Sequence, residues 1–378
     1  MKDSPMKVLA LALGLALWSS ALSASEPNFQ FSSIRMQGMG GAGAAVANGE
    51  NALYANPAAL AQISDIVVRI APLRFELNDA ILDKQQALTD LSSSFSSEDT
   101  EAITNLIKNG LVPTKLGLNF SSIPLLSMAF NGFGMGLFGQ TQLVGNFVNK
   151  TNPVFQVSGI GDGAGVVGFA RNMTLFGVDL SLGVTGKYIL RGRTVDKDGS
   201  NVISLGIADI ISAANGTSPS VNIQAGSGFG FDCAVMGTLE VPFVGKVKTA
   251  LVLNNVGTSI SGSDINGNAF TTTIPMLPTL GLGFDSSLPF IGDFVTAVDY
   301  QFDSNSQDMF KNIHAGFEKS VWIFALRGGI NQGYLTLGMG TDLFWILHLN
   351  YAYTTTAFGK KVGLDESSFH VVELRFLF

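Results

Sequence analysis

Histidine, cysteine and serine side chains supply most of the metal ligands and nucleophiles in proteins, so their positions limit the chemistry that this chain could perform. The chain has three histidines and one cysteine, at His314, His348, His370 and Cys233. None of the four lies close in sequence to another, whereas a zinc site needs clustered His or Cys ligands. We therefore expect no metal, and a single cysteine excludes an intrachain disulfide.

One hydrolytic pair is conceivable near the C-terminus, where His370 follows Ser367–Ser368. A serine activated by a histidine can attack an ester. If 369–378 is a β-strand, His370 points to the same side as Phe376 and Phe378, and no acid has a matching phase to activate it. A histidine among outward-facing aromatic residues is therefore the favoured interpretation, and a phospholipase is the lesser alternative.

The string Gly38-x-Gly40-x-x-Gly43 matches a dinucleotide-binding fingerprint. That fingerprint functions between a strand and a helix of a βαβ unit, where the helix N-terminus meets the pyrophosphate. Here no hydrophobic strand precedes the glycines, and a secretory signal lies upstream. We expect no nucleotide, no other cofactor and no enzymatic activity.

The composition indicates an unusually apolar chain without a membrane-spanning helix. Of 378 residues, 46% are hydrophobic, 13% are charged and 44 are glycine. Ordinary soluble domains carry roughly 25% charged residues. Beyond the N-terminus no run of ~18 apolar residues occurs, as a spanning helix would require. Two fold classes are compatible with this composition, an apolar soluble β protein and a membrane β-barrel. In a membrane barrel the apolar residues occupy every second position of each strand.

Residues 1–24 have the features of a signal peptide. Lys2 and Lys7 supply the positive start, Val8–Trp18 the apolar core, and Ser19–Ala24 the small residues of a cleavage region. We expect cleavage after Ala24. Removal of two basic residues and one acidic residue leaves 20 basic and 28 acidic residues, a net charge of −8. This charge disfavours nucleic acid as a partner.

Period-two alternation predicts fourteen strands from residue 65 onward, each within reach of the ~9–11 residues that a tilted spanning strand needs. Their ranges are 65–76, 114–130, 133–148, 163–172, 176–190, 223–240, 246–257, 277–287, 293–302, 311–319, 322–330, 333–341, 344–355 and 369–378. The second is expected to bend at Pro124. One face of each strand is apolar and the other polar, as in a barrel with lipid outside and a polar lumen. The sequence thus predicts an all-β membrane protein, a roughly fourteen-stranded antiparallel outer-membrane β-barrel over 65–378.

The polar face of the strands defines the expected lumen. Its charged and titratable residues are Asp179, Lys187, Asp232, Asp299, His348, Glu373 and Arg375. The favoured interpretation is that they pair with one another and with a plug, because buried charges need partners. The alternative is that Lys187 or Arg375 binds the carboxylate of an acyl ligand. Cys233 shares a face with Phe229 and Phe231, so we expect it to face lipid.

The connections supply a second argument, because long and short ones alternate. An antiparallel barrel whose N- and C-termini both lie in the periplasm has short periplasmic turns and long outer loops. One exception is 331–332, which is short where a long loop is due, so two strands could be miscounted there. Helical outer loops are expected near 78–109, with a helix at Glu98–Asn109, and near 200–214, with a helix at 202–214.

The second outer helix carries much aliphatic surface for an external loop. Its apolar residues are Val202, Ile203, Leu205, Ile207, Ile210 and Ile211. These residues either collect an apolar molecule at the barrel mouth or pack on their own barrel rim. The sequence favours packing only slightly.

The segment 25–64 precedes the first strand and is rich in glycine and alanine. Asn56-Pro57 has the chemistry of a helix start, with Asn as N-cap and Pro at the first helical position. Short helices are expected at Gly43–Ala47 and Pro57–Ile63. Their methyl-rich surfaces suit close packing on a glycine-lined wall, so the segment is either a hatch inside the barrel or a helical segment outside it.

Two phrases of this segment carry a family resemblance. Gly38-Met-Gly-Gly-Ala-Gly and Asn51-Ala-Leu-Tyr-Ala-Asn-Pro-Ala-Ala-Leu60 resemble the start of FadL-type outer-membrane proteins. Ala297-Val-Asp-Tyr-Gln-Phe302 and 314–340 are similar to the PorV-like and spirochaetal branches of that group. The resemblance implies a fourteen-stranded barrel closed by an N-terminal hatch, with Asn56, Pro57 and Ala58 in the hatch.

The resemblance also implies a function and a location. Members of this group reside in the bacterial outer membrane, where the transporters pass long-chain fatty acids or similar apolar molecules passively, with a moving hatch and a lateral opening. A bend at Gly145 in the third strand would match that opening. PorV-like members instead dock exported proteins, which is the main alternative. The terminal Phe378 resembles the signal that barrel-insertion machinery reads.

Overall fold

The computed structural model describes residues 31–95, 100–112, 114–175, 178–196, 200, 202–214, 222–242, 245–288, 292–343, 346–357, 360–363 and 366–378. The expected signal peptide lies outside these residues. Within them, sixteen strands form one sheet. Two of these, β6 (Ile203–Gly206) and β9 (Ala269–Thr273), are short additions to a ring of fourteen. The predicted fold class and strand number are therefore confirmed.

The fourteen ring strands follow the predicted order along the chain. They are β1 (Val67–Asn78), β2 (Thr114–Phe130), β3 (Phe133–Val148), β4 (Val154–Leu175), β5 (Val178–Val195), β7 (Asn222–Val241), β8 (Gly245–Asp264), β10 (Leu277–Leu288), β11 (Gly292–Gln301), β12 (Ile313–Val321), β13 (Phe324–Asn331), β14 (Tyr334–Leu343), β15 (Leu347–Ala357) and β16 (Glu366–Leu377). Each pairs antiparallel with its neighbours. The pairs β1–β16 and β8–β10 close the barrel, so no ring strand is left as a free edge.

Side chains alternate between the two faces of the wall. On β5, Val184 and Leu190 are exposed on the outside, whereas Thr185 and Lys187 are buried inside. An apolar outer band and a polar interior are the arrangement of bacterial outer-membrane barrels. Among the described residues, no helix is both long and apolar enough to cross a membrane.

Loop lengths define the two ends of the barrel. Only two or three residues separate each of β2, β4, β7, β10, β12 and β14 from the next strand, which marks the periplasmic end by the usual asymmetry of such barrels. At the other end, β13 and β14 are joined by Gln332 and Gly333, both with positive φ. No strand is missing there: this outer connection is simply a tight turn.

The register between β2 and β3 shifts around Pro124, where a bend is predicted. At Gly145, β3 and β4 keep an unbroken register from Phe133 to Val148, so no bulge in this pair marks a lateral opening. Further along the ring, β8 has two register shifts against β7 and a positive φ at Asn255.

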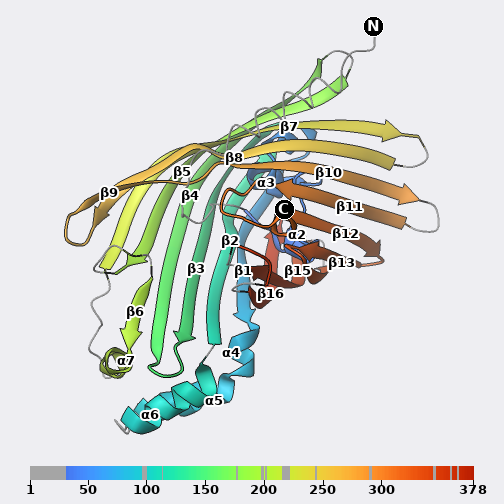
Figure 1. Ribbon diagram of the computed structural model, residues 1–378. Helices are drawn as coiled ribbons and strands as arrows, with labels where there is room; N and C mark the ends of the chain where they lie inside the picture. The colour runs from blue at the N-terminus through green and yellow to red at the C-terminus, as the bar shows by residue number, and fades with distance from the viewer. Residues whose placement is uncertain are drawn as a thin grey trace.

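The outer helices form a compact module at the external end of the barrel (Figure 1). They are α4 (Asp79–Asp83), α5 (Gln85–Phe95), α6 (Thr100–Leu106), η3 (Ile107–Leu111) and α7 (Ile207–Ala214). The predicted helix at 202–214 is wrong in its first part, because 203–206 form β6, which pairs with the outer end of β4. That end of β4 extends beyond β5 and offers free backbone groups, which outweigh a local helical pattern.

The N-terminal segment lies inside the barrel, where Figure 1 shows it in blue behind the strands. We call residues 31–63 the hatch. It contains α2 (Ile34–Gly38), η1 (Gly49–Asn51), α3 (Ala52–Ala55) and η2 (Pro57–Gln62). The main apolar core is shared between hatch and wall, so the barrel is filled rather than open. The helix predicted at 43–47 is replaced by a turn at 44–46, where the Ala44 and Val46 carbonyls accept from Asn56 and Arg35 instead of from N–H groups four residues on.

Candidate gate inside the barrel

The Asn56-Pro57-Ala58 turn lies at the centre of the hatch. Asn56 is fully buried. Its side-chain oxygen accepts a hydrogen bond from the Ala58 N–H at 3.0 Å, which caps η2. Its side-chain amide donates to the Ala44 carbonyl at 2.6 Å. One side chain therefore starts η2 and ties it to the turn at 44–46 of the hatch.

Glycines of the wall let the hatch backbone approach closely. A Cβ added at Gly183 of β5 would lie 2.2 Å from the carbonyl carbon of Pro57. A Cβ added at Gly316 of β12 would lie 2.2 Å from the Met39 carbonyl oxygen. Any larger side chain at these wall positions would displace the hatch. The methyl-rich hatch and the glycine-lined wall are thus complementary surfaces.

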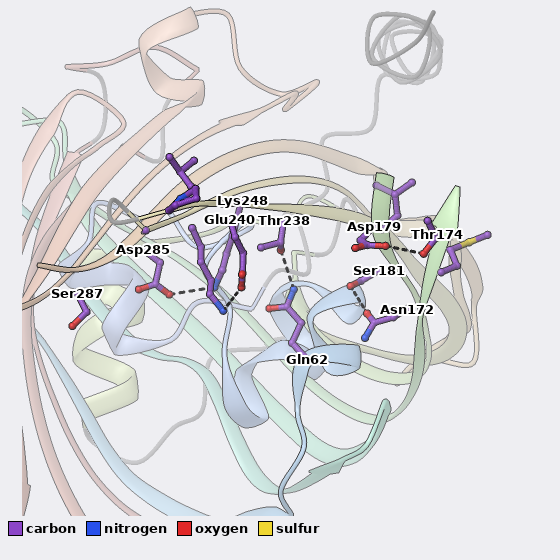
Figure 2. Close-up of a pocket in the computed structure, with 16 residues that line it drawn as sticks. Gln62, Asn172, Thr174, Asp179, Ser181, Thr238, Glu240, Lys248, Asp285 and Ser287 are labelled. Carbon is purple, nitrogen blue, oxygen red and sulfur yellow. Dashed lines mark hydrogen bonds and ion pairs between the residues drawn. The ribbon is translucent and has the colours of Figure 1, made fainter. Parts of the chain in front are cut away.

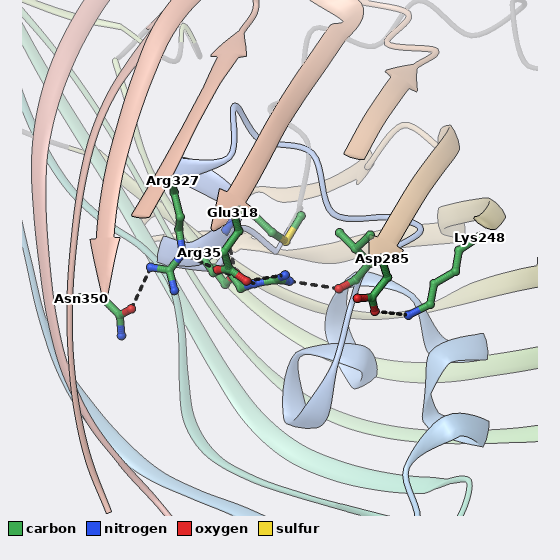
Figure 3. A network of polar contacts seen from close by, with 9 residues as sticks. Arg35, Lys248, Asp285, Glu318, Arg327 and Asn350 are labelled. Atoms are coloured by element: carbon green, nitrogen blue, oxygen red, sulfur yellow. Dashed lines mark hydrogen bonds and ion pairs between the residues drawn. The ribbon is translucent and has the colours of Figure 1, made fainter. Parts of the chain in front are cut away.

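Ionic contacts hold the start of the hatch (Figure 3). Arg35 of α2 pairs with Glu318 of β12 at 2.9 Å. Glu318 also accepts from Arg327 of β13 at 2.6 Å, and Arg327 donates to Asn350 of β15 at 2.9 Å. The shared carboxylate gives both guanidinium groups an anionic hydrogen-bond partner away from bulk water. This network links α2 to three wall strands.

Further wall side chains bind the hatch backbone directly. One carboxylate oxygen of Asp299 accepts from the Gly43 and Ala44 N–H groups at 2.7 and 2.8 Å. The His314 ring nitrogen Nδ1 lies 3.1 Å from the Gly40 carbonyl. These bonds satisfy backbone groups that no helix or sheet partner reaches.

Two predicted lumen residues, Lys187 and Asp232, form a buried pair at 2.7 Å. Lys187 also donates to the Asn255 side chain at 2.8 Å. Asp232 in turn accepts from the Asn255 N–H at 2.8 Å. The three residues thus fix the distorted part of β8. Lys187 is engaged within the wall, which matches the pairing interpretation rather than the binding of a ligand carboxylate.

The other predicted lumen residues are scattered around the barrel. Glu373 is buried and pairs with Arg69 of β1 at 3.1 Å. His348 bonds Asp342 at 2.5 Å near the periplasmic end. Arg375 is half-buried beside His348 in the β15–β16 register. Asp179 is exposed at the periplasmic rim, where Thr174 donates to it. The structure does not gather these residues into one site.

Two aromatic rings of the hatch meet one ring of the wall. Phe31 stacks on Tyr54 with ring centroids 5.1 Å apart, and both contact Phe138 of β3. A small cavity beside them is also lined by Lys187 and Asp232. The hatch and the wall therefore share an aromatic cluster with one charged pair at its edge.

A cavity with a largely polar lining, which we call the vestibule, lies at the periplasmic end of the barrel (Figure 2). Its volume is about 1430 Å³. Gln62, the last residue of η2, lines it and bonds Thr238 at 3.3 Å. Its charged lining residues are Asp179, Glu240, Lys246, Lys248 and Asp285.

The aliphatic outer helix packs against its neighbours. Ile207, Ile210 and Ile211 contact a buried cluster that includes Ile103 of α6 and Phe147 of β3. Leu205 is half-buried on β6 and Val202 is exposed. Packing on the rim thus accounts for the three isoleucines.

The C-terminal histidine has no serine partner among the described contacts. His370 faces outward, with Nε2 3.1 Å from Asp79 and Nδ1 2.8 Å from the Tyr351 hydroxyl. Ser367 instead bonds Asn78 inside the barrel, and Ser368 bonds Thr355. The geometry gives no support to serine hydrolysis here.

Sequence reasoning missed the ionic anchor and the aromatic cluster. Arg35, Glu318 and Arg327 are far apart in the chain, and no local pattern pairs them. One signal was present: Arg35 is the single charge in an apolar, glycine-rich stretch, and such a charge needs a partner when buried.

The chain is similar to several solved outer-membrane channels. The Pseudomonas putida toluene transporter TodX shares 12% identity at a TM-score of 0.48, over 93% of this chain and 98% of that chain. The Ralstonia pickettii toluene transporter TbuX shares 11% at 0.47, over 93% and 98%. A Pseudomonas aeruginosa FadL homologue shares 11% at 0.33, over 93% and 99%. No family model and no curated protein matches the chain.

Proposed function

We propose that this protein passes apolar or amphipathic small molecules, such as long-chain fatty acids, passively across the outer membrane through a hatch-gated barrel. The observation that carries the proposal is the hatch itself. It fills the lumen yet is joined to much of the wall by small-residue packing, which interlocks less than large side chains do. A segment with that contact surface can shift without unfolding the barrel.

The lumen chemistry supports a ligand with an apolar body. Phe31, Tyr54 and Phe138 form an aromatic cluster inside the lumen, and aromatic side chains bind flat or chain-like hydrocarbon by dispersion and burial. The charged residues that line the cavity beside Phe138, Lys187 and Asp232, are paired with one another. No resident charge therefore has to be neutralised before an apolar group enters this part of the lumen.

Mass spectrometry of small molecules that co-purify with the detergent-solubilised protein tests the proposal. The wild type is compared with Asn56→Ala/Pro57→Ala, which removes the cap of η2, and with Ser93→Ala on an exposed outer helix as a control. We expect a stoichiometric lipid-like ligand in wild type and control, and altered occupancy in the double variant. Only non-stoichiometric membrane lipid in all three would contradict transport.

A second candidate function is docking of exported proteins, as in the PorV-like branch. The observation in its favour is apolar surface on an outer loop, where Met309 and Phe310 are 60% and 61% exposed. Exposed apolar residues on an external loop suit a protein partner. Replacement of both by serine, followed by assays of protein secretion and lipid uptake in the same cells, separates the two: docking predicts loss of secretion alone.

A further inference from the structure

One buried carboxylate of the wall has no basic partner in the part of the chain that the structure describes. Asp299 of β11 is 1% exposed. Its Oδ2 atom accepts from the Gly43 and Ala44 N–H groups at 2.7 and 2.8 Å, but none of the described residues donates to its Oδ1 atom. His314 lies opposite Asp299 on β12, yet its Nδ1 atom is engaged by the hatch and by β13 instead. A buried carboxylate is costly unless it is neutralised, paired or bound to a cation.

Asp299 borders a cavity of about 20 Å³ between the hatch and the wall, which we call the Asp299 cavity. Three strands supply its polar lining, namely Asn254 of β8, Thr279 of β10, and Asp299 and Gln301 of β11. In the register Thr279 pairs with Gln301, and Asn254 lies diagonally across from Thr279. The hatch covers the cavity with apolar and aromatic side chains. A polar space of this size holds one small ion or one water molecule.

The described lining of the Asp299 cavity offers oxygen atoms and no basic side chain. Thr279 is 4% exposed, and its Oγ1 atom, like Oδ1 of Asp299, has no hydrogen-bond partner within the described chain. Asn254 and Gln301 can each turn an amide oxygen toward the same space. Carboxylate, hydroxyl and amide oxygens are the ligands that hard cations prefer. The cavity therefore has the donor set of a cation site.

We infer that the Asp299 cavity binds one monovalent hard cation of the size of Na⁺, with Asp299 Oδ1 and Thr279 Oγ1 as its principal ligands. One carboxylate balances one positive charge, whereas Ca²⁺ takes roughly 6–8 oxygens, commonly from several carboxylates. In the described part of the chain, no group of three or more His, Cys, Asp or Glu side chains could hold a metal ion. The site uses oxygen donors, so it differs from the metal sites that the spacing of histidine and cysteine excludes.

A cation at this position holds the hatch against the wall through the carboxylate. It balances the charge of Asp299, so that Oδ2 stays an ionised acceptor for Gly43 and Ala44, and bonds to an ionised acceptor are stronger than neutral ones. Because the hatch covers the cavity, release of residues 43–44 exposes the ion to water. An ion that binds only the closed hatch stabilises that state by mass action. This inference concerns retention of the hatch and holds whether or not a ligand passes through the barrel.

Hydrogen–deuterium exchange at residues 43–44 tests the inference on the whole detergent-solubilised protein. Exchange is compared in sodium chloride and in choline chloride at equal concentration, since choline is too large for the cavity. We expect exchange to be about tenfold slower in sodium chloride when Na⁺ is at about ten times its Kd, because the open population falls by the factor 1 + [L]/Kd. Exchange in the outer helix α6 should be the same in both salts, which controls for general salt effects.

Thr279→Val is the sharpest variant, because valine keeps nearly the shape of threonine and lacks only the hydroxyl ligand. In choline chloride it should exchange like the wild type, since Thr279 Oγ1 has no described hydrogen bond to lose. In sodium chloride the protection should disappear. Thr336→Val is the matched control: Thr336 is also buried, but its hydroxyl donates to the Gly38 carbonyl at 3.2 Å, outside the cavity. This control should keep the wild-type ratio between the two salts.

Binding of radiolabelled sodium in equilibrium dialysis gives a second readout. The wild type should bind about one Na⁺ per chain. Asp299→Asn should bind none, because an amide nitrogen in place of Oδ1 offers no ligand, while the amide oxygen can still accept from the hatch. No bound sodium in the wild type, or equal wild-type exchange in the two salts, overturns the inference and leaves Asp299 a neutral acid. A sodium effect that Thr279→Val retains in full overturns it as well, because the ion then binds elsewhere.

Discussion

Glu318→Gln should release the start of the hatch while the barrel stays folded. The carboxylate accepts from Arg35 and Arg327 at once, and all three side chains are largely buried. Its loss leaves two guanidinium groups facing each other without a counter-charge. Breaking a buried pair on one side costs about 3–5 kcal/mol. We take about 3 kcal/mol, since the Arg35 and Glu318 side chains keep 14% and 13% exposure.

Trypsin cleavage after Arg35 measures this release. Trypsin reaches Arg35 only when α2 leaves the wall, so the rate follows the population of the open form when opening is fast. A loss of about 3 kcal/mol raises that population, and the cleavage rate, about 100-fold. The fragment is quantified by mass spectrometry, and heat-modifiable migration of the barrel in gels shows that the barrel itself is intact.

Glu240→Gln is the matched control, because Glu240 forms an exposed ion pair with Lys246 at the periplasmic rim. Exposed pairs contribute little, so this variant should be cleaved at the wild-type rate. Cleavage of Glu318→Gln at that same rate would refute the view that the ionic network retains the hatch.

Three further variants follow from the same contacts. Lys187→Met leaves Asp232 buried without its cation and should lower the barrel's unfolding temperature in gel-shift assays. The double variant Lys187→Met/Asp232→Leu should recover most of that lost temperature. Equal unfolding temperatures for the single and the double variant would contradict this pairing. Leu53→Ala removes a fully buried side chain and should cost about 2–5 kcal/mol of hatch stability, read as faster chymotrypsin cleavage after Tyr54. Ile207→Ser should loosen the outer helical module, seen as faster backbone hydrogen exchange in α6, while ligand uptake stays unchanged; reduced uptake with unchanged exchange would show that Ile207 contacts ligand.

The barrel could be predicted from the sequence because alternation is a local signal. Alternation within a single strand shows which residues face lipid and which face the lumen, as Val184 and Lys187 of β5 do. The number of strands and the lengths of the loops then fix the topology. The predictions that were wrong concern segments whose local pattern is overridden by contacts with other parts of the chain. Residues 203–206 look helical alone but meet the free outer end of β4. The carbonyls of Ala44 and Val46, which a helix at 43–47 would use, accept from Asn56 and Arg35 instead.

The gate was harder to predict than the barrel. Asn56 and Pro57 predict a helix start, because Asn is a favoured N-cap and Pro is favoured at the first helical position. In the structure Asn56 caps η2 and Pro57 is its first residue. The partners of the hatch are not encoded nearby: Arg35 and Glu318 are 283 residues apart. Pairings at that separation depend on barrel closure and register, which a single sequence does not specify residue by residue.

If a movable hatch admits a small amphipathic molecule, uptake in one vesicle population should be under reversible control. Proteoliposomes carrying Gln62→Cys/Thr238→Cys in the Cys233→Ser background, a pair whose native side chains are hydrogen-bonded, are cross-linked with a short bis-thiosulfonate reagent. Fluorescent dodecanoate is added outside, and the cross-link is reduced during the recording. We expect no protein-dependent uptake while the hatch is cross-linked and an immediate rise on reduction. Uptake that is equal before and after reduction, or equal to that of protein-free vesicles throughout, would contradict it.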